Sequence, residues 1–509
     1  MNHTTKKTDR PPYGLIAVLM VGAFIAFLNN TLLNIALPTI MKDLKVEPST
    51  VQWLATGFML VNGILIPISA FLIQKFSVRR LFLAAMGLFT LGTILGGFAH
   101  VFPLLLAGRM IQASGSAIMM PLLMNVMLTS FPIEKRGTAM GVFGLVLMFA
   151  PAIGPTLSGW IVEHYDWRML FHFITPIAII VILLGFFLLK DKKDKVDLRL
   201  DFISVLLSTV GFGGILYGFS SAGTDGWDSP IVYETLIVGV ISLVTFIVRQ
   251  LKQDKPMLNF SIFKYPMFAL SSTISMVVTM ALFSGMLLLP IYVQTIRGIS
   301  PIDAGLMLLP GAIIMAIMMP ITGKLFDIFG GRILAIIGLI ITVVTTYYFS
   351  KLTLDTTYKH LIILYTIRMF GMSMVNMPVT TNGLNQLPTR FYPHGTAMNS
   401  TLQQVSGAIG TALLVTVMST RSVTHGKEIA ASAMKHVTGH PTAAMLVQMK
   451  HQIQMKAMLE GINDAFFVAT FIAAVALILA LFIKRAKQAE DPKAENSSGQ
   501  KVAVKLDGN

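Results

Sequence analysis

Long apolar runs constrain this chain more than any other feature of its sequence. Each run is long enough to cross about 30 Å of hydrocarbon as a helix, and a chain in hydrocarbon must satisfy its backbone hydrogen bonds internally. The sequence therefore predicts an all-α membrane protein with fourteen transmembrane helices. The runs lie at residues 13–37, 51–74, 81–99, 101–128, 138–162, 171–189, 202–220, 231–248, 266–293, 302–322, 333–350, 361–381, 395–418 and 463–483.

Composition and charge agree with this class and exclude others. Hydrophobic residues make up 54% of the 509 residues and charged residues 12%, which excludes a soluble globule. The net charge of +15 would indicate nucleic-acid binding in a soluble protein, but here Lys and Arg concentrate in the tails and in alternate connections. We therefore predict cytoplasmic termini and no nucleic-acid partner. Without cysteine there is no disulfide or thiolate ligand, and we predict neither a metal site nor a cofactor.

Two sequence patterns recur eight runs apart. Residues 70–80 follow the second run and residues 323–332 follow the tenth, while Arg109 and Arg368 lie in the fourth and twelfth runs. Repeated halves with a substrate site between them are typical of transporters. This predicts a cytoplasmic tail at 1–12, six-helix bundles at 13–189 and 266–483, two inserted helices with loops at 190–265, a long extracellular loop at 421–460 and a disordered tail at 484–509. Within that loop, residues 441–460 suit an amphipathic helix, and a solvated hairpin is the alternative.

Arg109 and Arg368 each lie deep in an apolar run that contains no acid close by. A lone guanidinium costs about 2.5 to 3.5 kcal/mol at a helix centre, so each is expected to face the protein interior or a wet cavity. One interpretation is a cavity charge that meets a substrate or tunes a proton site, with Gln112 bonded to Arg109 from the same helical face. The alternative is a structural tie to backbone carbonyls of a neighbouring helix.

Acids are missing from the middle of every run. A permanently cationic cargo would find no counter-charge there, and burying an unpaired cation is costly. We therefore predict that the small amphipathic cargo is neutral, zwitterionic or anionic. The predicted cavity residues, besides the two arginines, are Asn29, Asn30, Asn34, Asn62, Gln112, Asn376, Asn399 and Gln403.

Several segments together carry a family resemblance. They are residues 29–38, 109–115, 150–160, Trp167-Arg168, Asp201 at the start of the seventh run, and 289–310. This ordered set resembles the fourteen-span drug:proton antiporters of the major facilitator superfamily, which include multidrug and lincomycin-resistance-type exporters. The resemblance covers nearly the whole chain. It implies a monomeric exporter in a bacterial plasma membrane that exchanges cargo for protons by alternating access.

The resemblance also implies a hinge in the fifth run. In the family this antiporter motif bends the helix and seals it against leak, although helix packing alone predicts the same residue types. The hinge residues are Pro151, Gly154, Pro155 and Gly159.

The connections after the second and tenth runs are interpreted as a cytoplasmic gate. Asp327 and Arg332 are expected to form a charge pair that exists in only one conformation. The first-half copy has Gln74 in place of the family's acid, which weakens a latch there, and its basic residues also serve as membrane anchors. The predicted gate residues are Lys75, Arg79, Arg80, Gly323, Asp327, Gly330 and Arg332.

Four residues are candidates for the proton carrier. Asp303, Glu163, Asp166 and His172 lie at run ends, and each is equally an ordinary interfacial residue. Proton coupling is thus implied by the family resemblance rather than by these residues.

Three functions are compatible with these patterns. The first is drug efflux, and the second is export of an endogenous lipid or cell-envelope precursor. The third is a membrane-embedded lipid transferase, which would require clustered acids or histidines at one interface. No phosphate-binding Gly-x-x-x-x-Gly-Lys-Ser/Thr loop occurs, which argues against an ATP-driven pump. We expect a transporter and not an enzyme.

Overall fold

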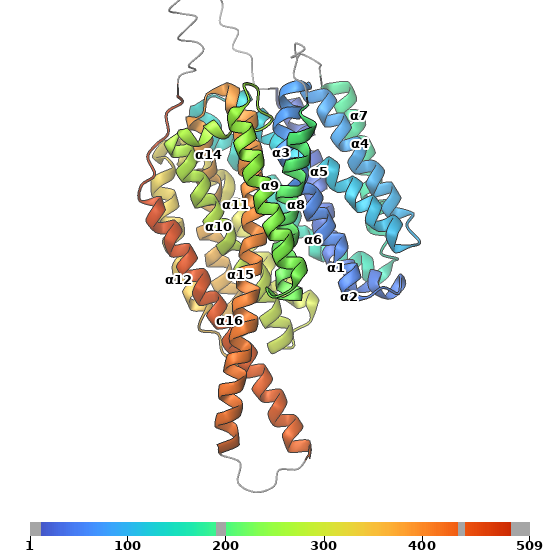
Figure 1. The fold of residues 1–509 in the computed structure, drawn as a ribbon, viewed down its shortest axis with the longest axis vertical. Helices are drawn as coiled ribbons and strands as arrows, with labels where there is room; N and C mark the ends of the chain where they lie inside the picture. The colour runs from blue at the N-terminus through green and yellow to red at the C-terminus, as the bar shows by residue number, and fades with distance from the viewer. Residues whose placement is uncertain (1–11, 190–199, 436–442, 490–509) are drawn as a thin grey trace, which may run out of the picture.

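The structure is a computed structural model that describes residues 12–189, 200–435 and 443–489, and every regular element in these ranges is helical (Figure 1). The predicted N-terminal tail lies outside the described residues, apart from residue 12. The first group of helices comprises α1 (Tyr13–Asp43), α2 (Pro48–Val51), α3 (Trp53–Lys75), α4 (Val78–Gly97), α5 (Phe102–Ser130), η1 (Ile133–Lys135), α6 (Arg136–His164) and α7 (Met169–Leu188).

The remaining helices form an inserted pair and a second group. The inserted pair is α8 (Phe202–Asp225) and α9 (Pro230–Lys252). The second group comprises η2 (Phe260–Lys264), α10 (Pro266–Ile291), η3 (Tyr292–Ile296), α11 (Pro301–Phe329), α12 (Gly331–Phe349), α13 (Tyr358–Ser373), α14 (Asn376–Gln386), η4 (Thr389–Phe391), α15 (Tyr392–Lys435) and α16 (Ala443–Ala480).

The predicted all-α membrane fold is confirmed for the described residues. Thirteen helical segments are long and apolar enough to cross a membrane, with α13 and α14 counted as one segment. The remaining long helix, α6, has 29 residues and packs along α1 and α11. A total of fourteen spans therefore depends on α6 and stays a prediction.

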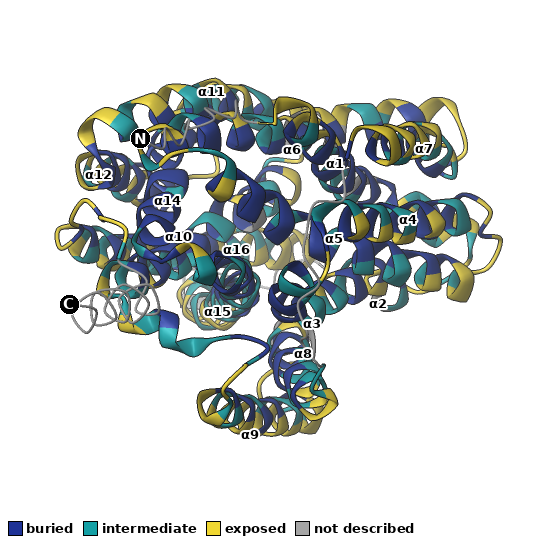
Figure 2. Ribbon diagram, turned by 90° about the horizontal axis from the view of Figure 1, so that it is seen from above, coloured by how far each residue is buried: buried dark blue, intermediate teal, exposed yellow. Residues whose placement is uncertain are grey.

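The helices gather in two groups with the inserted pair outside them. α1 and α3–α7 pack on one another, and so do α10–α16. The two groups meet where α6 packs against α11 and where α15 packs against α3 and α5. α8 lies against α3 and α15, and α9 lies outside α8 at the edge of the molecule (Figure 2). The inserted pair thus covers one of the two seams between the groups.

Close contacts fasten α8 over this seam. A Cβ at Gly63 of α3 would lie 1.9 Å from Leu216 Cδ1, so the leucine occupies the space that the glycine leaves open. Tyr217 stacks on Trp53 with ring centroids 5.8 Å apart. Trp227 Nε1, after α8, donates a 2.6 Å hydrogen bond to Thr416 Oγ1 of α15. The inserted pair therefore contacts both groups.

The other seam is formed by direct backbone contact of α6 with α11. A Cβ at Gly323 would lie 2.3 Å from the carbonyl oxygen of Gly137, and one at Gly141 would lie 2.5 Å from that of Met319. Small residues allow helix backbones to approach this closely in membranes. Side chains at these glycines would force the two groups apart.

Residues 421–460, predicted as a long loop in which residues 441–460 suit an amphipathic helix, are helical over a longer stretch than predicted. α15 continues to Lys435 and α16 begins at Ala443, so the two helices form a hairpin that extends beyond the other helices (Figure 1). Only residues 436–442 between them lie outside the described residues. Contacts across the hairpin favour helix over loop: Asp464 accepts a hydrogen bond from Arg421 Nε and bonds His425 Nε2 at 2.9 Å.

The start of the C-terminal tail, predicted to be disordered, is placed against the second group. Ala489 N donates to Gln386 O at 2.9 Å, and Arg485 Nη2 donates to Asp327 O at 2.7 Å. Residues 490–509 lie outside the described residues. Tyr13, at the start of α1, packs edge-on against Phe131, which follows α5. We call the side that holds Tyr13 and residues 484–489 the terminal side, and the hairpin marks the opposite side (Figure 1).

Substituting Gly323 with alanine tests the seam between α6 and α11. The new Cβ meets backbone and not a flexible side chain, so we expect a loss of about 1 to 3 kcal/mol in stability, as for other overpacked sites. Thermal unfolding of the purified protein in detergent measures it. Gly159→Ala is the matched control, since nothing lies within 4 Å of a Cβ there. Equal unfolding temperatures for the two variants would contradict close packing at this seam.

Candidate functional site

Arg109 lies at the centre of a polar network between α5 and α1. Its Nη1 donates to Asn29 Oδ1 at 2.9 Å and to Gln112 Oε1 at 2.6 Å, and its Nη2 donates to Asn30 Oδ1 at 3.2 Å. The guanidinium carbon lies 4.3 Å from the ring centroid of Phe58 on α3. The predicted bond between Arg109 and Gln112 is thus confirmed. Neutral amide oxygens, rather than an acid, satisfy this cation.

The network continues into α4 and holds Arg109 firmly. Gln112 Nε2 donates to Thr93 Oγ1 at 2.8 Å, and that hydroxyl donates to Phe89 O at 2.7 Å. α4 and α5 approach closely enough that a Cβ at Gly92 would lie 2.4 Å from the carbonyl oxygen of Gly108. Arg109 is 1% exposed. Its guanidinium is therefore held in place by three helices of the first group.

Arg368 occupies the related position on α13 but has different partners. Its Nη2 donates to the carbonyl oxygen of Ala281 at 2.7 Å and to Ser284 Oγ at 2.9 Å, both on α10. The residue is completely buried. This is the tie to a neighbouring backbone carbonyl that the sequence offered as its alternative interpretation.

The other predicted cavity amides are spread over several helices. Asn62 on α3 and Asn399 on α15 are buried, while Asn376 on α14 and Gln403 on α15 are half-buried. Asn34 lies in α1, but its side chain is outside the described residues. The structure therefore brings only Asn29, Asn30 and Gln112 together with an arginine, and a shared cavity for the whole set stays a prediction.

The antiporter motif lies where α6 packs on α1. A Cβ at Gly154 would lie 2.3 Å from Thr31 Oγ1, and Ser158 Oγ donates to Leu32 O at 2.6 Å. Helix α6 runs without interruption past Pro151 and Pro155, whose side chains lie outside the described residues. Nothing lies within 4 Å of a Cβ at Gly159. Close approach thus requires glycine at 154 and not at 159.

Asp327 joins the two helix groups at the terminal side. Its carboxylate accepts hydrogen bonds from Gly137 N and Thr138 N, both at 2.8 Å, and from Thr138 Oγ1 at 2.7 Å. These donors belong to the first turn of α6, where unpaired N–H groups and the helix dipole favour an anion. Among the described ion pairs none joins Asp327 to Arg332, because both carboxylate oxygens bond to α6 in this conformation, so a pair that forms only in the other conformation stays a prediction.

Arg136, one residue before Gly137, is a second connection that the sequence analysis missed. Its Nη1 donates to Asn385 Oδ1 of α14 at 3.1 Å, and its guanidinium carbon lies 5.0 Å from the ring centroid of Tyr392. Arg136 is 6% exposed. Arg136 lies outside the repeated sequence patterns. The one sequence signal for its role is its position as a basic residue at the start of an apolar run.

The first-half copy of the gate has no matching connection. Gln74 Nε2 donates to the carbonyl oxygen of Ala70, within its own helix. Arg79 Nη2 donates to Phe186 O of α7, and the ammonium of Lys75 lies 5.4 Å from the ring of Phe71. Lys75 and Arg79 thus contact residues of the first group, whereas Asp327 of the second copy bonds across the seam to α6.

The remaining gate residues lie around the end of α11. Gly330 ends this helix with φ of +80°, a backbone conformation that favours glycine, and Gly323 contacts α6 as described above. Arg332 is exposed at the start of α12, and Arg80 is exposed near the start of α4.

The candidate proton carriers lie at the surface of the described structure. Asp303 is exposed and bonds Ser300, which caps α11, at 2.7 Å. Asp166 is exposed and pairs with Arg168 at 3.0 Å, while Glu163 is exposed and His172 is half-buried. These positions agree with interfacial residues, and a proton-carrying role for any of them stays a prediction.

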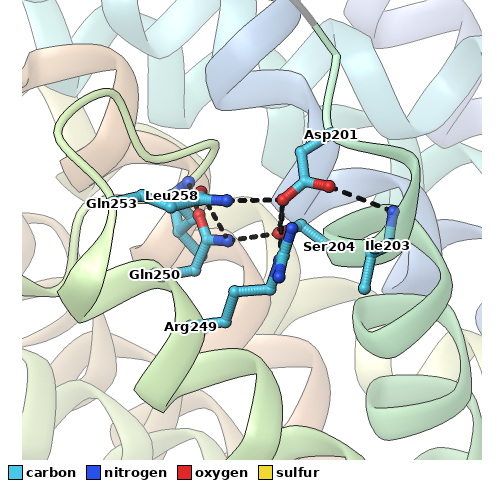
Figure 3. A network of polar contacts seen from close by, with 7 residues as sticks. All are labelled: Asp201, Ile203, Ser204, Arg249, Gln250, Gln253 and Leu258. Carbon is cyan, nitrogen blue, oxygen red and sulfur yellow. Dashed lines mark hydrogen bonds and ion pairs between the residues drawn. The ribbon is translucent and has the colours of Figure 1, made fainter.

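Asp201 organises the terminal side of the inserted pair (Figure 3). Its carboxylate accepts from Ile203 N at 3.1 Å and Ser204 Oγ at 2.7 Å in α8, and from Arg249 Nε at 2.8 Å in α9. Gln253 Nε2 also donates to it. The hydrogen bond from Arg249 is the main reason why the pKa of Asp201 lies well below its ordinary value of 3.8. The carboxylate therefore cross-links α8 and α9.

Replacing Asp327 with asparagine tests its bonds to α6. The variant loses the charge and one acceptor oxygen, and hydrogen bonds to charged groups contribute about 1.5 to 3 kcal/mol each. A Met319→Cys reporter at the seam, which is 3% exposed, is then expected to react with a maleimide about tenfold faster, since about 1.4 kcal/mol corresponds to tenfold.

The chain has no other cysteine, so labelling reports on this position alone. Asp355→Asn, an exposed site between α12 and α13, is the matched control and should leave labelling unchanged. An equal rate in the Asp327→Asn background would show that the bonds to α6 do not hold the seam closed.

Asp201→Asn tests the cross-link within the inserted pair. Because the folded-state pKa of Asp201 is depressed, its stabilisation is complete above the unfolded value of 3.8 and is lost as the pH falls below it. We expect the variant to be less stable at pH 7 by about 1 to 3 kcal/mol. Thermal unfolding in detergent should show that the difference in stability between the wild type and the variant disappears as the pH falls below about 4. The exposed Glu234→Gln on α9 serves as control, and a gap that is independent of pH would show that charge is not its cause.

Two groups of membrane-spanning helices, repeated polar positions and a polar link across their seam define the class of protein as a secondary transporter of small molecules. The profile of the Major Facilitator Superfamily matches residues 19–411, and the chain belongs to this family. It is therefore a multi-pass protein of the plasma membrane.

Named relatives refine this assignment. The chain is 43% identical to Lincomycin resistance protein LmrB of Bacillus subtilis, covering 93% of this chain and 96% of that protein. It is 49% identical to the uncharacterized MFS-type transporter YhcA of the same species, covering 94% of each. Multidrug export protein EmrB of Haemophilus influenzae is 25% identical, covering 92% of this chain and 95% of that protein.

A solved structure shows the same fold. The human organic anion transporter MFSD10 superposes with a TM-score of 0.65 at 13% identity, covering 93% of this chain and all of that chain. At this identity the likeness concerns the fold alone. The relatives and the fold agree with the predicted transporter class and, within it, with the drug-exporter branch.

Proposed function

We propose that this protein exports small amphipathic compounds, lincosamide-type drugs among them, in exchange for protons and by alternating access. The observation that carries the proposal is the bond of Asp327 to the first turn of α6 across the seam between the helix groups. Such a bond is made or broken as a unit when the groups rock, so it biases two discrete states of the carrier. The names of the drug-resistance relatives support export of drugs.

The chemistry of the described interior supports the class of cargo. Arg109 and Arg368 are buried, and their hydrogen-bond partners among the described residues are amides, a hydroxyl and a backbone carbonyl rather than acids. A permanent cation would be repelled by these groups and would find no counter-charge among them. Neutral, zwitterionic and anionic amphiphiles avoid this cost.

Proton coupling is inferred from the family and not from one carboxylate. Among the described acids, Asp303, Glu163 and Asp166 are exposed and Asp327 bonds to α6. We propose that coupling involves one of these surface acids, or His172, together with the Arg109 network. The protein acts as a monomer in this proposal, with no cofactor.

Uptake into everted membrane vesicles tests both coupling and the role of Arg109. A proton gradient should drive accumulation of a lincosamide, and a protonophore should abolish it. Arg109→Gln should reduce the rate by at least about tenfold, because about 1.4 kcal/mol of lost interaction is enough for that and several hydrogen bonds are removed. Lys351→Gln, an exposed site after α12, is the control for removal of one positive charge.

Two results would contradict parts of this proposal. Accumulation that persists with the protonophore and requires sodium would replace the proton as the coupling ion. Normal uptake by Arg109→Gln would show that the network around this residue serves the fold only.

A further inference from the structure

The two buried arginines differ in how many of their hydrogen-bond donors have acceptors. A guanidinium carries five N–H donors. In Arg109 both terminal nitrogens have acceptors, and only Nε lacks one. In Arg368 only Nη2 has acceptors, while Nη1 and Nε have none among the described residues. Three of its five N–H groups are thus unpartnered.

This deficit is costly where Arg368 lies. The residue is completely buried, and each buried unpaired donor costs about 1 to 3 kcal/mol, with charged groups at the upper end. The described ion pairs include none with Arg368, so its positive charge also lacks a counter-charge. A partner that supplies both acceptor oxygens and negative charge would remove both costs.

The guanidinium of Arg368 packs directly against the backbone of α10. Nη1 lies against Gly285 of α10, where a Cβ would be only 1.6 Å away. The adjacent Ser284, and Ala281 one turn earlier, already accept from Nη2. Gly285 therefore provides the space that Nη1 occupies, and a side chain at this position would displace the guanidinium.

We propose that Arg368 is the binding residue for an acidic group of the cargo, a carboxylate or a phosphate, and this proposal rests on the function proposed above. The acidic group accepts hydrogen bonds from Nη1 and Nε in the conformation in which α10 and α13 are apart. Arg109, whose terminal nitrogens are already satisfied within the first group, keeps its network. Anionic and zwitterionic amphiphiles are thus the preferred cargo, ahead of neutral ones.

A matched pair of fluorescent probes tests this preference. Dansylglycine carries a carboxylate, and dansylglycinamide has the same size without the charge. Titrating both into the purified full-length protein in detergent should show the acid binding about tenfold more tightly, equivalent to about 1.4 kcal/mol. Arg368→Gln should reduce the preference to within about twofold, and Arg368→Lys should keep part of it because the charge remains.

Two further variants complete the test. Gly285→Ala keeps the charge but displaces Nη1, so it should also lose the preference, which keeps the proposal testable if Arg368→Gln does not fold. Lys351→Gln removes an exposed charge and should retain the full preference. Size-exclusion profiles establish that each variant is folded.

The outcomes separate this proposal from the proposed function. Wild-type protein that does not bind the acid more tightly than the amide would overturn the anion site, as would a full preference in Arg368→Gln or in Gly285→Ala. Lincosamide uptake into vesicles is measured in parallel. Normal uptake without a preference for the acid removes only the role of Arg368, whereas absence of uptake removes the exporter itself.

Discussion

Buried polar groups in this protein must find their partners inside the protein, because hydrocarbon offers none. This constraint accounts for the helices themselves and for the arrangement of the polar side chains between them. Arg109 lies where Asn29, Asn30 and Gln112 present oxygen atoms, and Asp327 lies where α6 presents unpaired N–H groups. The positions that remain incompletely satisfied, above all Arg368, are therefore the ones at which a ligand has most to contribute.

The two seams between the helix groups differ in construction. At one seam, glycines bring the backbones of α6 and α11 together and Asp327 bonds across them. At the other, α8 of the inserted pair lies over α3 and α15 (Figure 2). The repeated sequence patterns predict a weaker latch in the first-half copy, where Gln74 replaces the acid, and Gln74 bonds to its own helix. Of the two copies, the second, with Asp327, is the one that bonds across a seam among the described residues.

Much of the fold could be predicted from the sequence, and less of the site. Helix positions follow from apolar runs, and the bond between Arg109 and Gln112 follows from their spacing on one helical face. By contrast, the hairpin beyond Arg421 carries polar residues that indicate a loop, and cross-helix contacts such as that of His425 with Asp464 keep it helical. Arg136 was missed because its partner, Asn385, is distant in the sequence.

The sequence by itself determined the class of protein, the positions of most long apolar segments and the absence of acids from their centres, since these depend only on residue type and spacing. Tertiary structure decided which polar groups on different helices meet. In this conformation Asp327 bonds to Gly137 and Thr138, because helix packing brings the first turn of α6, whose N–H groups favour an anion, to the carboxylate. Likewise, the packing of α10 against α13 determines that Nη1 and Nε of Arg368 lack acceptors among the described residues.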